Sequence, residues 1–127
     1  MTSTLDAGAV PSIDLDEINL NGAPCLRFVF KGHFNSDVCH SATAVWSRKF
    51  DEKSTQTFDL LWDCTFMDGF DYDARNEWVE TLSKYAHQIN TIHVVSNSVL
   101  IRGAARVMGK FSKYEMKVYK TIEELSI

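Results

Sequence analysis

The sequence lacks long apolar runs, clustered basic residues and closely paired cysteines. No window approaches the ~20 consecutive apolar residues that cross a bilayer, and MTSTLDAGAVPSIDLDEI has no basic stretch followed by an apolar run of signal-peptide length. The net charge of −4, with Lys and Arg dispersed among acids, argues against nucleic-acid binding. Three cysteines without close spacing suit reduced thiols. We therefore expect a cytoplasmic protein with no transmembrane segment and no nucleic-acid partner.

The composition fits one folded domain. With 127 residues, of which 45% are hydrophobic and 12% aromatic, the chain is long enough for one core and too short for two. Residues 1–12 contain Thr, Ser, Gly and Pro with little apolar periodicity. We predict a loose N-terminal leader over 1–12 and a single domain over 13–127.

The apolar spacing along residues 13–127 alternates between strand and helix patterns. Strands are predicted over 13–20 and 25–32, joined by a tight turn at Asn21 and Gly22, which tolerate positive φ. A helix is expected over 35–50 after the capping residues that begin at Asn35, and the strongest helical pattern covers 71–89. The remaining expectations are strands over 57–63, 91–97 and 115–120, a helix over 98–111 capped by Ser98, and a terminal helix over 121–127.

This order, β-β-α-β-α-β-α-β-α, predicts an α/β domain with a mostly parallel sheet of about five strands. The strands alternate apolar and mixed positions, which indicates helices mainly on one face and therefore a two-layer fold. The other face carries Val29, Leu61, Val95 and Tyr119 among polar residues. Such a partly apolar face could pack against a second subunit, giving a homodimer, or against the N-terminal leader.

The stretch DCTFMDGF, Asp63 to Phe70, ends an apolar strand and precedes the helix predicted from residue 71. Together with the element order and with INTIHVVSNSVLIRGAARVM, it resembles the STAS domain, the fold of bacterial anti-sigma-factor antagonists, and more closely its STAS/CRAL-TRIO-like bacterial branch. The likeness covers roughly residues 13–127. In the antagonists the turn after the third strand reads approximately DLSFMDSSGL, and the matching residues here are Asp63, Thr65, Phe66, Met67 and Asp68.

The chain departs from this family at the position that controls antagonist function. The resemblance implies a hydroxyl residue just after the second Asp, where an added phosphate controls partner binding through its charge. Gly69 and Phe70 stand there in this sequence, and neither can be phosphorylated. Thr65 matches a position that is not phosphorylated in the family. The resemblance therefore implies the STAS scaffold without its phosphoswitch.

Candidate ligand or partner residues gather where the predicted parallel strands end. Loops at the carboxyl ends of such strands, and helix N-termini, are where open α/β sheets bind ligands. The candidates at these ends are Asp63, Cys64, Thr65, Asp68, Gly69, Phe70, Asp71, Asn97 and Ser98. Simpler roles compete: Asp71 or Asp73 as a helix cap, Asp68 as a turn former, and Cys64 as buried core rather than as a redox thiol. The carboxylates could also hold Mg²⁺ or Ca²⁺, but their spacing matches no closed cation loop.

The sequence shows no catalytic or cofactor-binding constellation. His33, Cys39 and His40 cannot easily converge on one metal ion, and GAARVMG lies in a predicted helix without the lysine of a phosphate loop. We therefore expect no enzyme activity, no metal and no cofactor.

Two functions from different classes remain open. One is a non-catalytic interaction module that binds a protein partner near Asp68 and the following helix. The other is a carrier or sensor for a small apolar ligand, with a pocket between the sheet and the helices of 71–87 and 98–111. A stripe of aromatic residues would form the core in the first case and partly line a cavity in the second: Phe28, Phe30, Phe58, Trp62 and Trp78.

Overall fold

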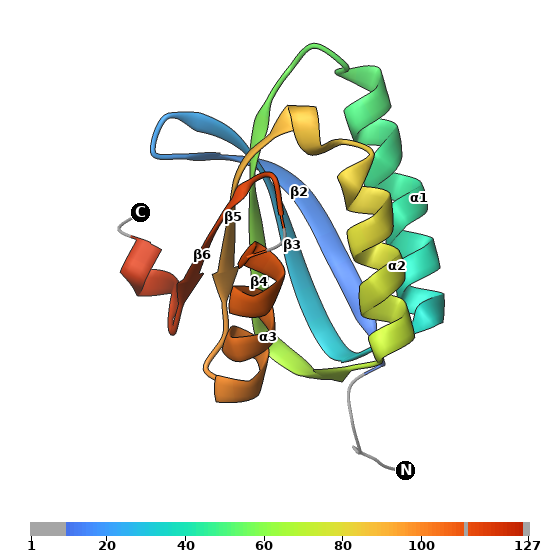
Figure 1. Cartoon of the computed structure of the whole chain (residues 1–127), viewed down its shortest axis with the longest axis vertical. Helices are drawn as coiled ribbons and strands as arrows, with labels where there is room; N and C mark the ends of the chain where they lie inside the picture. The colour runs from blue at the N-terminus through green and yellow to red at the C-terminus, as the bar shows by residue number, and fades with distance from the viewer. Residues whose placement is uncertain (1–9, 111, 126–127) are drawn as a thin grey trace.

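A computed structural model describes residues 10–110 and 112–125. Its single sheet has the strand order β2-β3-β4-β5-β6, with β2 antiparallel to β3 and all other neighbours parallel. The strands are β2 (Ser12–Leu20), β3 (Ala23–Phe34), β4 (Phe58–Phe70), β5 (Ile89–Val95) and β6 (Glu115–Tyr119). Three α-helices connect them: α1 (Ser36–Glu52), α2 (Tyr72–Ser83) and α3 (Val99–Lys110) (Figure 1).

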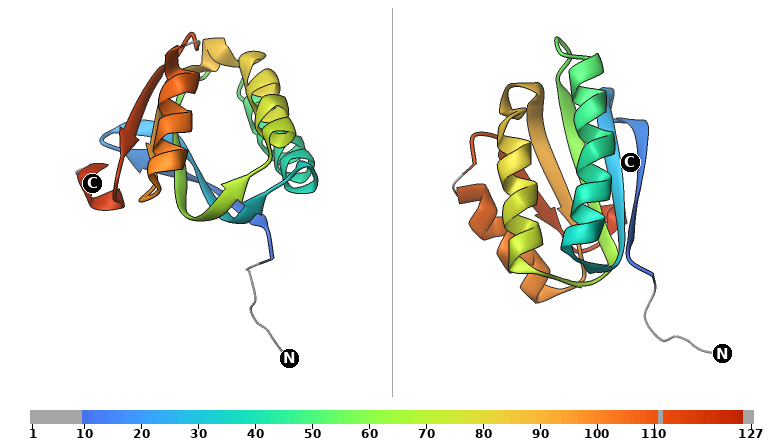
Figure 2. Two further views of the ribbon diagram at one scale, coloured as in Figure 1. Left: turned by 60° about the horizontal axis from the view of Figure 1, so that its bottom comes forward. Right: turned by 90° about the vertical axis from the view of Figure 1, so that its right-hand side faces the viewer.

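All three helices bury side chains in one cluster on the same face of the sheet. Figure 2 shows α1 and α2 side by side, with α3 standing apart over the other half of the sheet. The predicted two-layer α/β fold, with a mostly parallel sheet and helices mainly on one face, is confirmed.

Local sequence explains where the first elements begin and turn. Asn21 and Gly22 have φ values of 51° and 88°, so the predicted tight turn joins β2 to β3. The side chain of Asn35 accepts a hydrogen bond from the backbone N–H of Val38 at 3.0 Å, which confirms the predicted cap of α1.

Two predicted helices are shorter in the structure. The helical pattern over 71–89 divides into α2, which ends at Ser83, and a 3₁₀ turn, η1 (Ala86–Gln88), and β5 already begins at Ile89. The predicted terminal helix is a single 3₁₀ turn, η2 (Ile122–Leu125), whereas residues 126–127 lie outside the described part. Residues 1–9 of the predicted leader also lie outside it.

Aromatic side chains fill the core between sheet and helices. Trp78 of α2 packs edge to face against Trp46 of α1 and against Phe34 of β3, with ring centroids 5.3 Å apart in both pairs. Its contacts extend to Phe30 and Trp62 on the neighbouring strands. Such pairs contribute about 0.5–1.5 kcal/mol each beyond the burial of their area. Trp78 therefore ties α1 and α2 to the centre of the sheet.

The opposite face of the sheet has a smaller apolar cluster. Leu61 and Val95, predicted to lie on this mixed face, are fully buried there together with Leu125 of η2. His93 is also buried on this face, with Nε2 3.3 Å from the Asp59 carboxylate and Nδ1 3.1 Å from the Tyr119 hydroxyl. The C-terminal 3₁₀ turn therefore covers part of the face that the helices leave open.

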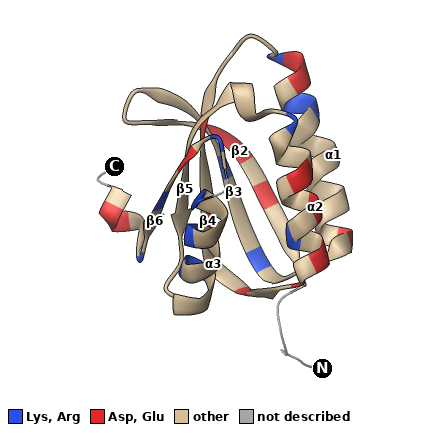
Figure 3. Ribbon diagram, in the orientation of Figure 1, with Lys and Arg blue, Asp and Glu red and all other residues tan. Residues whose placement is uncertain are grey.

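Charge is distributed unevenly among the helices. In Figure 3, α1 and α2 carry residues of both signs, whereas α3 carries Arg and Lys without any acid. The basic residues of α3 are Arg102, Arg106 and Lys110. None of the described helices is long and apolar enough to cross a membrane.

Candidate functional site

The stretch Asp63–Phe70 is the second half of strand β4, whereas the sequence predicted that this strand ends at residue 63. Strand β4 pairs with β5 only as far as Asp63, which lies opposite Val95. Beyond that point it pairs with β3 alone, up to the pair of Phe34 and Phe70. The end of β4 therefore diverges from β5 and from the N-terminus of α3.

Two extra residues in β4 bend this extension. Opposite Val29 and Lys31 of β3 stand Asp63 and Phe66, so β4 advances three residues while β3 advances two. A second extra residue separates Met67 from Gly69. At the first bulge, Oδ1 of Asp63 accepts a hydrogen bond from the backbone N–H of Thr65 at 3.1 Å. Bulges of this kind bend a strand and change which side chains face the core.

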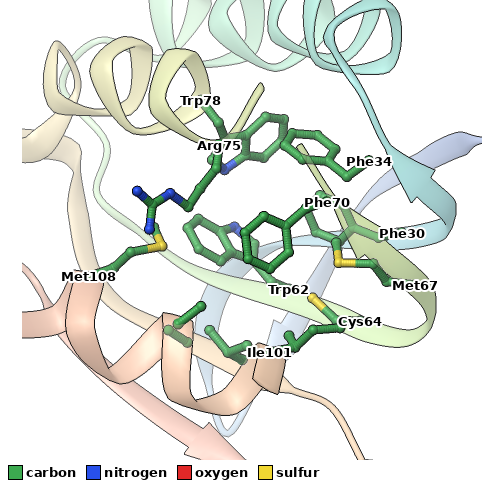
Figure 4. A pocket seen from close by; sticks show the side chains of 13 residues that line it. Phe30, Phe34, Trp62, Cys64, Met67, Phe70, Arg75, Trp78, Ile101 and Met108 are labelled. Carbon is green, nitrogen blue, oxygen red and sulfur yellow. The ribbon is translucent and has the colours of Figure 1, made fainter. Parts of the chain in front are cut away.

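The bend opens an apolar cavity between α2 and α3, which we call the α2–α3 cavity. It encloses about 490 Å³ of space not filled by protein atoms, part of it open to solvent. Strand β4 contributes Trp62, Cys64, Met67 and Phe70, because the bulges keep these four side chains on the helix-covered side. The other strands and the two helices contribute Phe30, Phe34, Arg75, Trp78, Val94, Ile101, Ala104, Ala105 and Met108 (Figure 4).

The surface of this cavity is almost entirely apolar, and two nitrogens of its lining side chains lie covered without hydrogen-bond partners. The indole Nε1 of Trp62 and the guanidinium Nε of Arg75 are buried and make no hydrogen bond with any residue in the described part of the chain. Burial also raises the pKa of the Cys64 thiol, which disfavours the thiolate form that a redox sensor needs. Cys64 is only 5% exposed, so the simpler role of a core cysteine fits the structure.

Other predicted site residues lie on the opposite side of β4. Asp63 and Thr65 line a surface depression together with Asn97, Lys120 and Glu123. Phe66 stands at its edge with 61% of its surface exposed. We call this surface the β4 rim, defined by Asp63, Thr65, Phe66, Asp68 and Asn97. The structure therefore brings Asp63, Thr65 and Asn97 together but separates them from Cys64 and Phe70.

The remaining candidates have structural surroundings of their own. Asp71 occupies the N-cap position of α2, but its carboxylate contacts Nε2 of His33 at 2.7 Å and makes no capping hydrogen bond. Asp68 is exposed, and Gly69 faces the His33 ring, whose Nδ1 would lie 3.4 Å from a Cβ at this position. The prediction that Asp68 forms a turn is wrong, because this residue belongs to the bulged strand.

Ser98 acts as the predicted cap of α3. Its hydroxyl accepts a hydrogen bond from the backbone N–H of Ile101 at 3.2 Å, and its own N–H donates to the Ser96 hydroxyl. Among residues 10–110 and 112–125, no group of three or more His, Cys, Asp or Glu side chains could hold a metal ion.

Sequence patterns pointed to the place of the cavity but missed several of its residues. The aromatic stripe divides, since Phe28 and Phe58 are fully buried whereas Phe30, Trp62 and Trp78 line the cavity. Arg75 and Met108 had no distinguishing signal, because a single Arg or Met on an amphipathic helix is ordinary. Helices α2 and α3 line the same cavity because β4 diverges from β5.

Comparisons with known proteins give structural neighbours only. No protein-family model matches the sequence, and no curated protein matches it. A crystal structure of an uncharacterised DUF3478-family protein with a SpoIIAA-like fold, from Shewanella loihica PV-4, is similar with a TM-score of 0.78 and 16% identity, over 95% of this chain and 96% of that one. The anti-sigma factor antagonist SpoIIAA in its unphosphorylated form is similar with a TM-score of 0.58 and 11% identity, over 90% of this chain and 93% of that one. At such low identity the likeness concerns the fold, and the fold of this chain is the STAS-type, SpoIIAA-like fold.

Proposed function

We propose that this protein is a non-catalytic STAS-type regulatory or interaction module that binds a protein partner without the phosphoswitch of the anti-sigma-factor antagonists. Gly69 and Phe70, which directly precede the N-cap residue Asp71 of α2, have no hydroxyl group. A switch based on phosphate at these two positions is therefore excluded by their chemistry.

The observation that carries this proposal is the exposed aromatic side chain of Phe66 on the β4 rim. It stands beside a depression with acidic, basic and amide side chains, from Asp63, Lys120 and Asn97. Aromatic side chains are enriched in the buried cores of protein interfaces, which are surrounded by a polar rim. Asp68 adds an exposed charge at the same end of β4 and makes no hydrogen bond or ion pair with the described residues.

Affinity capture with quantitative mass spectrometry tests this surface. We expect Asp68→Lys and Phe66→Ala each to lower the captured amount of the same partner at least about tenfold, as loss of a central interface residue does. Matched controls are Glu52→Lys at the far end of α1 and Val45→Ser on its exposed face, where the side chain is 45% exposed. All four variants should melt close to wild type. A partner retained by both rim variants would contradict the proposal.

The α2–α3 cavity supports a second function, a carrier or sensor for a small apolar ligand. Its walls are almost entirely apolar and come from the sheet and from both helices, as in many small-molecule sites. A ligand that binds only the folded state must raise the melting temperature as its concentration rises. Decanol is a suitable first probe, and an unchanged melting temperature up to its solubility limit would argue against the carrier function.

A further inference from the structure

We propose that the α2–α3 cavity binds a small carboxylic acid with an apolar body, and that Arg75 and Trp62 recognise its carboxylate. This inference rests on the second function proposed above, ligand binding in the cavity, and adds the chemical class of the ligand.

The hydrogen-bonding groups of the cavity wall are donors. Among the lining side chains there is no carboxylate, amide or hydroxyl oxygen that could accept a hydrogen bond from a ligand. The Nε1 of Trp62 is unpartnered within the described part of the chain, and Trp62 as a whole is only 5% exposed. A buried N–H group without an acceptor destabilises the folded protein. A ligand that supplies an acceptor for this N–H therefore binds more tightly.

Arg75 adds a positive charge that no carboxylate neutralises. Within residues 10–110 and 112–125, Arg75 forms no ion pair; one of its Nη atoms donates to the Asn76 side chain at 3.0 Å, and its Cζ lies 5.3 Å from the centre of the Tyr72 ring. Its Nε is buried and unpartnered.

The position of Arg75 predicts how the ligand would lie. Arg75 and Met108 line both the α2–α3 cavity and a second groove between the same two helices. The other side chains of this groove are polar and apolar and include the Glu80 carboxylate: Asn76, Val79, Glu80, Val107 and Ser112. Arg75 thus stands between the apolar interior and the outside (Figure 4). The carboxylate would meet Arg75 at the mouth, and the apolar body would extend inward along Phe30 and Phe34.

The donor set favours a carboxylate over a phosphate. One guanidinium and one indole N–H can satisfy the two oxygens of a carboxylate, whereas phosphate sites supply more charge and more donors. Neighbouring side chains cover the two nitrogens in the ligand-free protein. Met67 and Met108 line the cavity and are flexible enough to move aside when a ligand enters.

Calorimetric titration with decanoate and decanol, below the concentration at which decanoate forms micelles, tests the inference. We expect wild-type protein to bind decanoate at least about tenfold more tightly than decanol, as a charge-assisted hydrogen bond predicts. Arg75→Met should weaken decanoate binding by about tenfold and leave decanol binding unchanged. Trp62→Phe should also weaken decanoate selectively, because it removes the N–H but keeps an aromatic ring.

Two matched variants complete the design. Arg75→Lys keeps the positive charge and should retain part of the preference for decanoate. Arg106→Met removes an exposed charge of α3 outside the cavity and should bind both probes as wild type does.

Each contrary outcome identifies which proposal fails. Equal affinity of wild-type protein for decanoate and decanol would overturn the carboxylate inference and leave the apolar cavity as a binding site. Equal losses of decanoate affinity in Arg75→Met and Arg106→Met would also overturn the inference, because they would reflect net charge rather than a specific contact. If neither probe binds, both the inference and the carrier function are wrong.

Discussion

A single buried amide, Gln88, holds the end of helix α1. Its Nε2 lies 3.1 Å from the carbonyl oxygen of Phe50, 2.9 Å from that of Lys53 and 3.2 Å from that of Gln56. The last carbonyls of a helix have no partner within the helix, so a side-chain donor here replaces lost hydrogen bonds. The sequence placed Gln88 inside a long helix, because nothing local distinguishes a buried capping amide from an exposed one.

We expect Gln88→Met, which keeps a similar length but removes the donor, to lower the free energy of unfolding by about 1–3 kcal/mol. Urea denaturation followed by circular dichroism measures the loss. Gln56→Met is the matched control, because the Gln56 side chain makes no hydrogen bond with the described residues, and it should change stability by less than about 0.5 kcal/mol. Equal stabilities of the two variants would show that the Gln88 amide contributes nothing.

At the scale of elements, sequence periodicity predicts only the first half of strand β4. The alternation of Phe58, Leu60 and Trp62 with the mixed positions 59, 61 and 63 correctly predicts the first half of the strand. Past Asp63, residues facing the helices recur about every third position instead of every second, because two bulges intervene. A pattern broken in this way, with Asp and Gly at the breaks, is typical of a loop, so the second half of the strand was missed.

Glu17 forms ion pairs between the edge strand β2 and the C-terminal end of α1. Its carboxylate lies 2.9 Å from Nζ of Lys53 and 3.4 Å from Nζ of Lys49. The hydrogen bond with Lys53 is the main cause that lowers the pKa of Glu17 below its ordinary value. A carboxyl group with a lowered pKa in the folded state stabilises the protein above its unfolded pKa. That stabilisation is lost as the pH falls through the folded pKa.

We therefore expect Glu17→Gln to reduce stability at pH 7 and to have no effect at a pH low enough to protonate the carboxyl group in the folded protein. The loss at pH 7 should be small, about 0.2–1 kcal/mol, because both partners are substantially exposed to solvent. Urea titrations at a series of pH values measure it. Glu52→Gln, an exposed acid at the end of α1, should show no such pH dependence, and the same loss at every pH in Glu17→Gln would contradict the ion-pair explanation.

For the whole molecule, the two faces of the sheet are covered by different means. Three helices cover one face, while the short turn η2 covers the apolar centre of the other through Leu125. The partly apolar face that suggested a homodimer therefore already has part of its surface buried within one chain. Leu61 and Val95 need no second subunit to be removed from water.

We expect Leu125→Ala to destabilise the protein by about 2 kcal/mol, the lower end for a buried leucine, since Leu125 belongs to the smaller of the two apolar clusters. It should also increase concentration-dependent self-association, because it uncovers the centre of this face. Thermal melting and native mass spectrometry measure the two effects. Leu100→Ala, at a leucine that is 72% exposed, is the control, and equal behaviour of both variants would show that η2 does not protect this face.

The sequence by itself determined the order of the strands and helices, the two-layer architecture, the hairpin at Asn21 and Gly22 and the caps at Asn35 and Ser98. These features follow from periodicity and from short-range turn chemistry, which act over a few residues. Only the tertiary structure decided the α2–α3 cavity and the β4 rim. Both depend on where β4 leaves β5, and that divergence arises from strand pairing between residues far apart in the chain.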